Sequence, residues 1–344
     1  MTVRVGINGF GRIGRSFVRA ILANQEAGVE LVAVNDPFGD TGTMAHLLKY
    51  DSVAGVLPQD VKTTDDGIAV DGTSFRKVEE REPSAIPWGD LGVQVVIESS
   101  GVFTSREKAA GHLTGGAKKV VISAPSPDSD VTVCVGVNDD TYDPGSHDVI
   151  SNASCTTNCL APMARILHDT FGIERGMITT VHAYTSDQNL QDVATPTRSG
   201  KPDLRRMRAA ALSIIPNTTG AAKAIGLVIP ELKGKLDGMA LRVPVPDGSI
   251  TDLVAVLRGT PSADDVNKAF RDAAGTSRYQ SILQYSEAPL VSQDIVGNPS
   301  SCVFSARDTM VTEGLVKVLG WYDNEWGYSN RLVDLCAILG RRGL

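Results

Sequence analysis

Two side chains have the chemistry and the placement of a covalent catalytic pair. Cys155 lies in the run Ser-Asn-Ala-Ser-Cys-Thr-Thr-Asn-Cys over residues 151–159, at the expected start of a helix. The positive end of a helix dipole favours the thiolate, which is the reactive form of cysteine. His182 ends an expected strand over residues 177–182, so we expect it to project into a site where it can act as a base. Sequence alone does not show whether the two side chains meet.

The remaining cysteines and histidines are interpreted as structural. Cys159 lies one turn further along the same helix, where the dipole effect fades, and a metal pair with Cys155 would need ligands that the neighbourhood lacks. We therefore predict no metal site. The other thiols, expected to be free in a reducing compartment, are Cys134, Cys302 and Cys336. The other histidines, for which we expect solvated or satisfied surface positions, are His46, His112, His147 and His168.

A glycine-rich motif near the N-terminus is typical of dinucleotide binding. Residues 9–14 read Gly-Phe-Gly-Arg-Ile-Gly and lie between an expected strand and an expected helix. Such glycines permit a tight turn, close approach of a pyrophosphate and packing of the helix on the strand. Asp36 ends the next strand, where its carboxylate would accept hydrogen bonds from a ribose and repel a 2′-phosphate. The motif thus predicts NAD rather than NADP; the alternative is a glycine-rich turn that binds nothing.

The elements that must position these residues form two different patterns. In the first half, strands alternate with helices, which predicts a mostly parallel sheet; the strands are expected at 3–7, 31–35, 93–97 and 119–123. The second half has helices at 156–171, 220–228, 262–274 and 328–339, and strands at 177–182, 250–257 and 315–321. We predict an α/β Rossmann dinucleotide-binding domain over residues 1–153 and an α+β catalytic domain over residues 154–323, with a mixed, mainly antiparallel sheet.

Composition excludes several functional classes. The chain has 344 residues, 42% of them hydrophobic, which is enough for two domains with packed cores. A net charge of −7 argues against a nucleic acid or an anionic membrane as partner. No apolar run reaches the roughly 18 residues of a membrane helix, and the first residues lack the pattern of a signal peptide. We expect a cytoplasmic protein with no membrane association.

Motifs along the whole chain resemble phosphorylating glyceraldehyde-3-phosphate dehydrogenase of the type I, bacterial-like family. They lie at 6–15, 47–52, 151–162, 182–185, 220–224, 242–244 and 321–325. The resemblance implies a glycolytic and gluconeogenic oxidoreductase that converts D-glyceraldehyde 3-phosphate to 1,3-bisphosphoglycerate with NAD and inorganic phosphate. Cys155 would form a thiohemiacetal and then a thioester, and His182 would take the hemiacetal proton. The family also implies a homotetramer, and a C-terminal helix over residues 324–344 that completes the first domain.

The resemblance further implies binding residues. Those for NAD are Asn8, Gly9, Phe10, Gly11, Arg12, Ile13, Asp36, Arg81, Ser100, Gly101, Ser123, Asn324 and Tyr328, although Tyr328 is equally well explained by core packing. The substrate phosphate would contact Thr185 and Arg242. Inorganic phosphate would contact Ser154, Thr156, Arg206, Thr219 and Gly220. An alternative for the arginines at 205, 206 and 208 is a solvated basic cluster.

Two segments depart from the family pattern. The loop over residues 190–203 is longer by several residues, and in the family it reaches the cofactor of a neighbouring subunit and helps to exclude NADP. Residues 245–248 read Val-Pro-Asp-Gly where Thr-Pro-Asn is more common. Two alternative functions are an erythrose-4-phosphate dehydrogenase, and a non-catalytic interaction or redox-sensing protein in which Cys155 reacts with oxidants.

Overall fold

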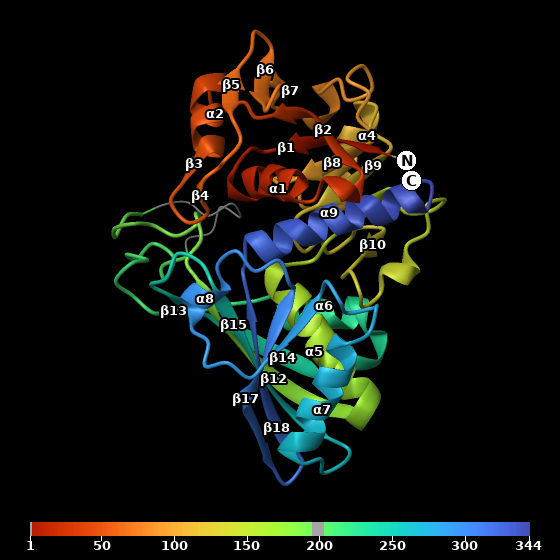
Figure 1. The fold of residues 1–344 in the computed structure, drawn as a ribbon, viewed down its shortest axis with the longest axis vertical. Helices are drawn as coiled ribbons and strands as arrows, with labels where there is room; N and C mark the ends of the chain where they lie inside the picture. Colours follow the sequence, from red (N-terminus) through yellow and green to blue (C-terminus); the bar gives the residue numbers. More distant parts are fainter. Residues whose placement is uncertain (1, 195–202) are drawn as a thin grey trace. The chain divides into compact units, whose positions relative to one another are not determined.

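The computed structural model describes residues 2–194 and 203–344, and the chain divides into two compact units (Figure 1). The first unit consists of Met1–Ala153 and Ser329–Leu344, and the second of Ser154–Tyr328. Helix α9 (Trp326–Arg341) begins in the second unit and continues in the first. Most of the lengthened loop, residues 195–202, falls outside the described residues. The expectation that this loop helps to choose the cofactor therefore concerns residues that the structure does not describe.

The first unit contains a nine-stranded sheet in the order β10-β11-β9-β8-β1-β2-β7-β6-β5. Its parallel strands are β1 (Val3–Asn8), β2 (Val29–Asn35), β7 (Thr73–Val78), β8 (Val95–Glu98), β9 (Lys119–Ile122), β10 (Val131–Thr132) and β11 (Val149–Ser151). An antiparallel edge is formed by β5 (Val61–Thr63) and β6 (Gly67–Val70). This arrangement confirms the predicted Rossmann-type sheet.

Helices of the first unit connect these strands. They are α1 (Arg12–Ala23), α2 (Thr41–Lys49), α3 (Arg106–Ala109) and α4 (Gly111–Thr114). The helix expected around residues 106–113 is divided in two at Ala110. Strands β8 and β9 are buried along their whole length, as expected for central parallel strands covered on both faces. The carboxyl ends of β1, β2, β8 and β9 therefore meet at one edge, where such sheets bind ligands.

The second unit contains a seven-stranded sheet in the order β13-β14-β12-β15-β18-β17-β16. The strands are β12 (Ile173–Ala183), β13 (Ile215–Thr218), β14 (Leu236–Val243), β15 (Ser249–Leu257), β16 (Leu283–Ser286), β17 (Cys302–Thr312) and β18 (Leu315–Tyr322). Pairs β12–β14 and β16–β17 are parallel, whereas the other pairs are antiparallel. The predicted mixed, mainly antiparallel sheet is confirmed.

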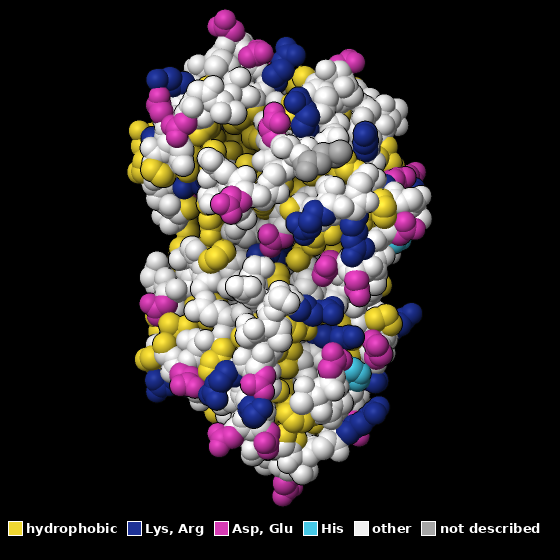
Figure 2. All heavy atoms as spheres, turned by 45° about the vertical axis from the view of Figure 1, so that its right-hand side comes forward, with side chains coloured by type: hydrophobic (Ala, Val, Ile, Leu, Met, Phe, Trp, Pro, Cys, Tyr) yellow, Lys and Arg dark blue, Asp and Glu magenta, His cyan; other side chains and the backbone are white. Residues whose placement is uncertain are grey.

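One face of this sheet is packed against α5 (Cys155–Phe171), α6 (Ala221–Val228) and α7 (Ala263–Ala274) (Figure 1). Alternate residues of β15 are buried toward these helices, which gives the strand a period of two. The opposite face carries exposed apolar side chains, among them Met177 and Met239. On the molecular surface seen in Figure 2, acidic and basic side chains are interspersed over both units.

Candidate active site

Cys155 is the first residue of α5, and the local sequence builds a strained turn before it. Ala153 has a φ of 54°, in the left-handed region that residues with a Cβ rarely adopt, and its side chain is fully buried. Ser154 is the N-cap, and its hydroxyl accepts a hydrogen bond of 3.0 Å from the Thr157 N–H. Because such strain is typical of functional sites, the turn itself marks Cys155 as a site residue.

The structure brings Cys155 and His182 together. The Cys155 Sγ lies 3.4 Å from the Nε2 of His182, which is near the end of β12 and is buried. The other ring nitrogen, Nδ1, lies 2.7 Å from the carbonyl oxygen of Ala183. A carbonyl can only accept, so Nδ1 carries the proton and Nε2 presents its lone pair to the sulfur. The pair is therefore arranged for proton transfer from the thiol to the imidazole.

Burial acts against ionisation of both members of this pair. It raises the pKa of the Cys155 thiol to about 11, while the nearby Arg242 guanidinium lowers that pKa. Burial, followed by the same guanidinium, lowers the pKa of His182 to about 3. The helix dipole alone predicts a readily ionised thiol. Burial opposes this effect, and it depends on packing between segments that are distant in the sequence.

Arg242, on β14, joins the catalytic pair to Thr185. One guanidinium nitrogen donates to the Thr185 hydroxyl at 2.9 Å and to the Ala183 carbonyl at 3.1 Å. The same nitrogen lies 3.1 Å from Nδ1 of His182, which is a close approach of charge rather than a bond, because both nitrogens carry protons. Arg242 and Thr185, both expected at the substrate phosphate, thus lie beside the pair.

Asp187 connects the two expected anion-binding regions, and no sequence motif singles it out. It accepts a hydrogen bond from Thr185 and forms an ion pair with Arg206. Arg206 also pairs with Asp203 at 3.2 Å. Burial raises the pKa of Asp187, but the Thr185 hydroxyl and the two arginines outweigh it, so the pKa lies below its usual value. Arg206 therefore lies in a set of ion pairs close to the residues that contact Arg242.

Other residues expected at inorganic phosphate are placed at two helix starts. Thr219 accepts a hydrogen bond of 3.2 Å from the Ala221 N–H, and Gly220 is the N-cap of α6. Thr156, in the first turn of α5, is instead buried, with its hydroxyl 2.9 Å from that of Tyr322. Tyr322 also bonds the Thr180 hydroxyl at 2.7 Å and packs its ring edge-to-face with His182. Tyr322 therefore fixes α5 to β12 and orients the histidine, a role that the sequence did not reveal.

A buried hydrogen-bond relay fixes Asn324. The Ala183 N–H donates to the Ser249 hydroxyl at 3.0 Å, and this hydroxyl donates to the Asn324 Oδ1 at 2.6 Å. The carboxamide is thus held with its oxygen toward Ser249 and its nitrogen directed away from it. Tyr328, the other C-terminal residue expected at the cofactor, is buried near the start of α9.

The glycine-rich turn of the first unit has the geometry of a phosphate cradle. Gly9 has a φ of 94°, and a Cβ there would lie 2.5 Å from the Ser100 nitrogen. A Cβ on Gly14 would lie 2.4 Å from the Gly9 oxygen, whereas one on Gly11 would meet nothing within 4 Å. Gly11 is the N-cap of α1 and has no side chain, so a ligand can approach its backbone closely. These residues fit a dinucleotide pyrophosphate at the start of α1.

The remaining residues expected at the cofactor lie around this turn. Asp36 follows β2, and its carboxylate accepts bonds of 2.9 Å from the N–H groups of Phe10 and Phe38. Arg12 forms a bidentate pair with Asp51, at 3.1 and 3.3 Å. The other members are half-buried Ile13 in α1, Arg81 stacked over the Phe38 ring, buried Asn8, and Ser100, Gly101 and Ser123 after β8 and β9.

One expectation about the histidines is wrong. His112 is not at the surface but fully buried, with hydrogen-bond partners on both ring nitrogens. These partners lie 14 and 24 residues away in the sequence, so no local pattern indicated them. Among the described residues, no three His, Cys, Asp or Glu side chains are grouped to hold a metal ion. The described helices include none long and apolar enough to cross a membrane.

Comparison with known proteins gives matches over both units. Residues 3–106 match the NAD binding domain of glyceraldehyde 3-phosphate dehydrogenase, and residues 154–324 match the C-terminal domain of that family. The chain is 60% identical over 346 residues to a glyceraldehyde-3-phosphate dehydrogenase of Mycobacterium avium, with 99% of each chain covered. It is 59% identical over 343 residues to that of Streptomyces coelicolor, with 99% of this chain and 100% of the relative covered.

Proposed function

The chain belongs to the glyceraldehyde-3-phosphate dehydrogenase family, and we propose that Cys155 and His182 carry out the covalent chemistry of its reaction. The protein is an NAD-dependent oxidoreductase that converts D-glyceraldehyde 3-phosphate, with phosphate, to 1,3-bisphosphoglycerate. The observation that carries the proposed residue roles is the 3.4 Å contact between the Cys155 Sγ and the Nε2 of His182. No comparison favours erythrose 4-phosphate as the substrate or a non-catalytic role.

The proton steps follow from this geometry. His182 takes the thiol proton on Nε2 as the sulfur attacks the aldehyde carbon, and returns it to the new oxyanion to give a thiohemiacetal. Bound NAD supplies the acceptor for the hydride that leaves this carbon. As the hydride leaves, His182 takes the hydroxyl proton again, and Cys155 holds a thioester. Attack by inorganic phosphate on the thioester carbon then breaks the carbon–sulfur bond and releases the acyl phosphate, and the Cys155 thiolate recovers the proton held by His182.

Two arginines are proposed to hold the anions of this reaction. Arg242 and Thr185 would bind the substrate phosphate, since a guanidinium offers forked donors to phosphate oxygens. Arg206, with Ser154, Thr156, Thr219 and Gly220, would bind inorganic phosphate. For Arg206 this requires exchange of its Asp187 partner for the anion. The buried hydroxyl of Thr156 faces Tyr322, so we propose that its backbone N–H takes this role.

The proposed residue roles are tested by measuring NADH formation. The complete mixture contains glyceraldehyde 3-phosphate, NAD and phosphate, and each is omitted in turn. We expect turnover to require all three, and Cys155→Ala to abolish it. A Cys159→Ala control, which removes the buried thiol one turn along α5, should keep turnover. Turnover by the Cys155→Ala variant would contradict the proposed mechanism.

We further propose a homotetramer, supported by the apolar face of the seven-stranded sheet opposite α5, α6 and α7. Met177 is 65% exposed there and Met239 is 40% exposed. Exposed apolar sheet faces are typical of interfaces between subunits. Sedimentation of Met177→Glu and Met239→Glu should give a smaller assembly, whereas Leu227→Glu on α6 should leave it unchanged. Sedimentation of the wild-type protein as a monomer would contradict the proposal.

We also propose a cytoplasmic location. All five cysteines are unpaired, and the chemistry needs Cys155 as a thiol, which a reducing compartment maintains. Cell fractionation with an antibody against the chain tests this directly. Recovery of the protein outside the cytoplasmic fraction would contradict it.

A further inference from the structure

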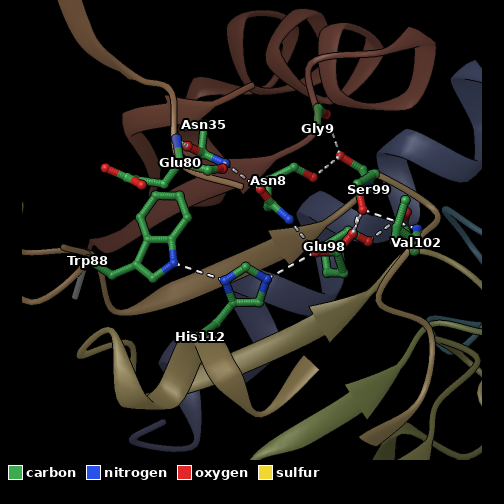
Figure 3. Close-up of polar contacts among 11 residues, drawn as sticks. Asn8, Gly9, Asn35, Glu80, Trp88, Glu98, Ser99, Val102 and His112 are labelled. Atoms are coloured by element: carbon green, nitrogen blue, oxygen red, sulfur yellow. Dashed lines mark hydrogen bonds and ion pairs between the residues drawn. The ribbon is translucent and has the colours of Figure 1, made fainter. Parts of the chain in front are cut away.

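A buried carboxylate that the proposed reaction does not use lies beside the glycine-rich turn of the first unit (Figure 3). Glu98 is the last residue of β8 and is 1% exposed. Its Oε2 accepts from the Asn8 side-chain amide at 2.5 Å and lies 2.9 Å from Nε2 of His112. Its Oε1 accepts from the Ser100 backbone N–H at 2.8 Å and from the Ser100 hydroxyl at 2.5 Å. One carboxyl group thus meets four polar contacts.

The partners of Glu98 present hydrogen-bond donors to its carboxyl group. The Trp88 indole N–H can only donate, and it lies 3.0 Å from Nδ1 of His112, so this nitrogen accepts. His112 is therefore the neutral tautomer with its proton on Nε2, which donates to Glu98. The Ser100 hydroxyl oxygen accepts the Val102 N–H at 3.1 Å, and its own proton is available for Glu98. Three of these contacts are donors to Glu98 and the fourth, the Ser100 hydroxyl, can donate, so the surroundings suit a carboxylate, which only accepts.

The same network fixes the backbone turns that follow β1 and β8. The Asn8 amide is oriented from its other end, because its Oδ1 accepts from the Asn35 side chain at 2.8 Å. The Ser99 N–H donates to the Asn8 carbonyl at 2.8 Å, and the Ser99 hydroxyl donates to the Gly9 carbonyl at 2.7 Å. Gly9 in turn packs directly on the backbone of Ser100. Glu98 therefore binds both turns, one through Asn8 and the other through Ser100.

We propose that Glu98 is a positioning residue for the NAD site, and that His112 and Trp88 hold its charge in place. The charged carboxylate draws residues 8–10 and 99–101 together at the carboxyl edge of the parallel sheet, where a dinucleotide binds. Turns held by charged hydrogen bonds are already arranged for the ligand, which reduces the ordering cost of binding. The inference rests on the proposed function only in taking NAD as the ligand.

The first test is Glu98→Gln, which keeps the shape and removes the charge. Whichever way its carboxamide is turned, its NH2 group faces donors, either Asn8 and His112 or Ser100. One turn must therefore move. We expect the dissociation constant of NAD, measured by calorimetric titration of the cofactor-free protein, to rise about ten- to a hundredfold. A wild-type circular dichroism spectrum and a cooperative thermal unfolding transition should confirm that the variant is folded.

The second test is Trp88→Phe, which alters the network at the end opposite the turns and remains informative if Glu98→Gln does not fold. It removes the donor that fixes the His112 tautomer, and we expect NAD to bind about three- to tenfold more weakly. The matched control is Tyr142→Phe in the same unit. Tyr142 is 2% exposed, and its hydroxyl has no hydrogen-bond partner among the described residues. We expect wild-type binding in this control.

Steady-state kinetics separates positioning from a structural role. A positioning role raises KM for NAD and leaves kcat at saturating NAD within about twofold, because the occupied site is restored. Loss of folded enzyme would lower kcat and leave KM unchanged, and that result would overturn the proposal. Wild-type NAD affinity in both variants, or an equal loss in Tyr142→Phe, would also overturn it. Failure of the wild-type protein to bind NAD would instead contradict the proposed function.

Discussion

His182 presents an unprotonated Nε2 to the Cys155 sulfur at 3.4 Å, because its Nδ1 proton is bonded to the Ala183 carbonyl at 2.7 Å. The tautomer is thus fixed by the peptide group that follows the histidine. The contact joins the start of α5 to the end of β12, and Tyr322 bonds both elements. The geometry of the pair is therefore a property of the second unit.

Replacement of His182 tests its role as a base. His182→Asn removes the nitrogen that faces the sulfur, and we expect acylation to slow by about 10²- to 10⁴-fold. The measurement is the burst of NADH in the absence of phosphate, where each active site forms its thioester once. His46→Asn, at an exposed position on α2, is the control and should keep the wild-type burst rate. An unchanged burst in His182→Asn would exclude the histidine as the base.

Arg242 should control the reactivity of the thiol even without substrate. Its positive charge lowers the pKa of Cys155 and so opposes the effect of burial. Arg242→Gln removes this charge, the pKa rises further, and the thiolate fraction at pH 7–8 falls. We expect alkylation by iodoacetamide, a neutral reagent, to slow by about tenfold, since one pKa unit is a factor of ten in thiolate.

The control for this measurement is Arg205→Gln. It also removes a positive charge from the second unit, but Arg205 is not among the groups that shift the pKa of Cys155. Arg205 donates to the Pro216 carbonyl and is exposed. An equal decrease in both variants would indicate a general charge effect. A faster reaction in Arg242→Gln would contradict the sign of the interaction.

The sequence predicted features that depend on local pattern, and missed those that depend on distant pairing. Periodicity and the glycine motif were enough for the type of both sheets and for seven of their strands, because strands and turns have short-range signals. Strand β14, which carries Arg242, was not among the expected strands. The contact between Thr156 and Tyr322 spans 166 residues, and that between Asn8 and Glu98 spans 90. No spacing rule connects such pairs, so Tyr322, Ser249, Asp187 and Glu98 were not singled out. The desolvation of the half-buried Cys155 thiol was missed for the same reason.

Asp36 should decide between NAD and NADP. Its carboxylate is held by the N–H groups of Phe10 and Phe38, at the end of β2. Asp36→Ala removes a charge that repels a 2′-phosphate, and we expect the ratio of kcat/KM for NADP to that for NAD to rise at least about tenfold. Glu30→Ala, an exposed change on the same strand, should leave the ratio unchanged. No shift in Asp36→Ala would refute its role in cofactor choice.

Asp247 should make the stability of the protein depend on pH. Burial, together with the neighbouring Asp323 and Glu325, raises the pKa of Asp247 to about 9. The folded protein then holds a proton that the unfolded chain releases above its ordinary pKa of about 4. Because the folded state binds more protons in this window, its stability decreases as the pH rises from about 4 to about 9.

Asp247→Asn removes this effect, because an amide does not ionise and still accepts the Gly248 N–H through its oxygen. We expect the variant to be more stable than the wild type at pH 8.5 by at least about 1 kcal/mol, with a smaller difference at pH 5. Thermal unfolding at both pH values measures this, with Asp264→Asn at an exposed position on α7 as the control. Equal differences at the two pH values would show that Asp247 does not retain its proton in the folded protein.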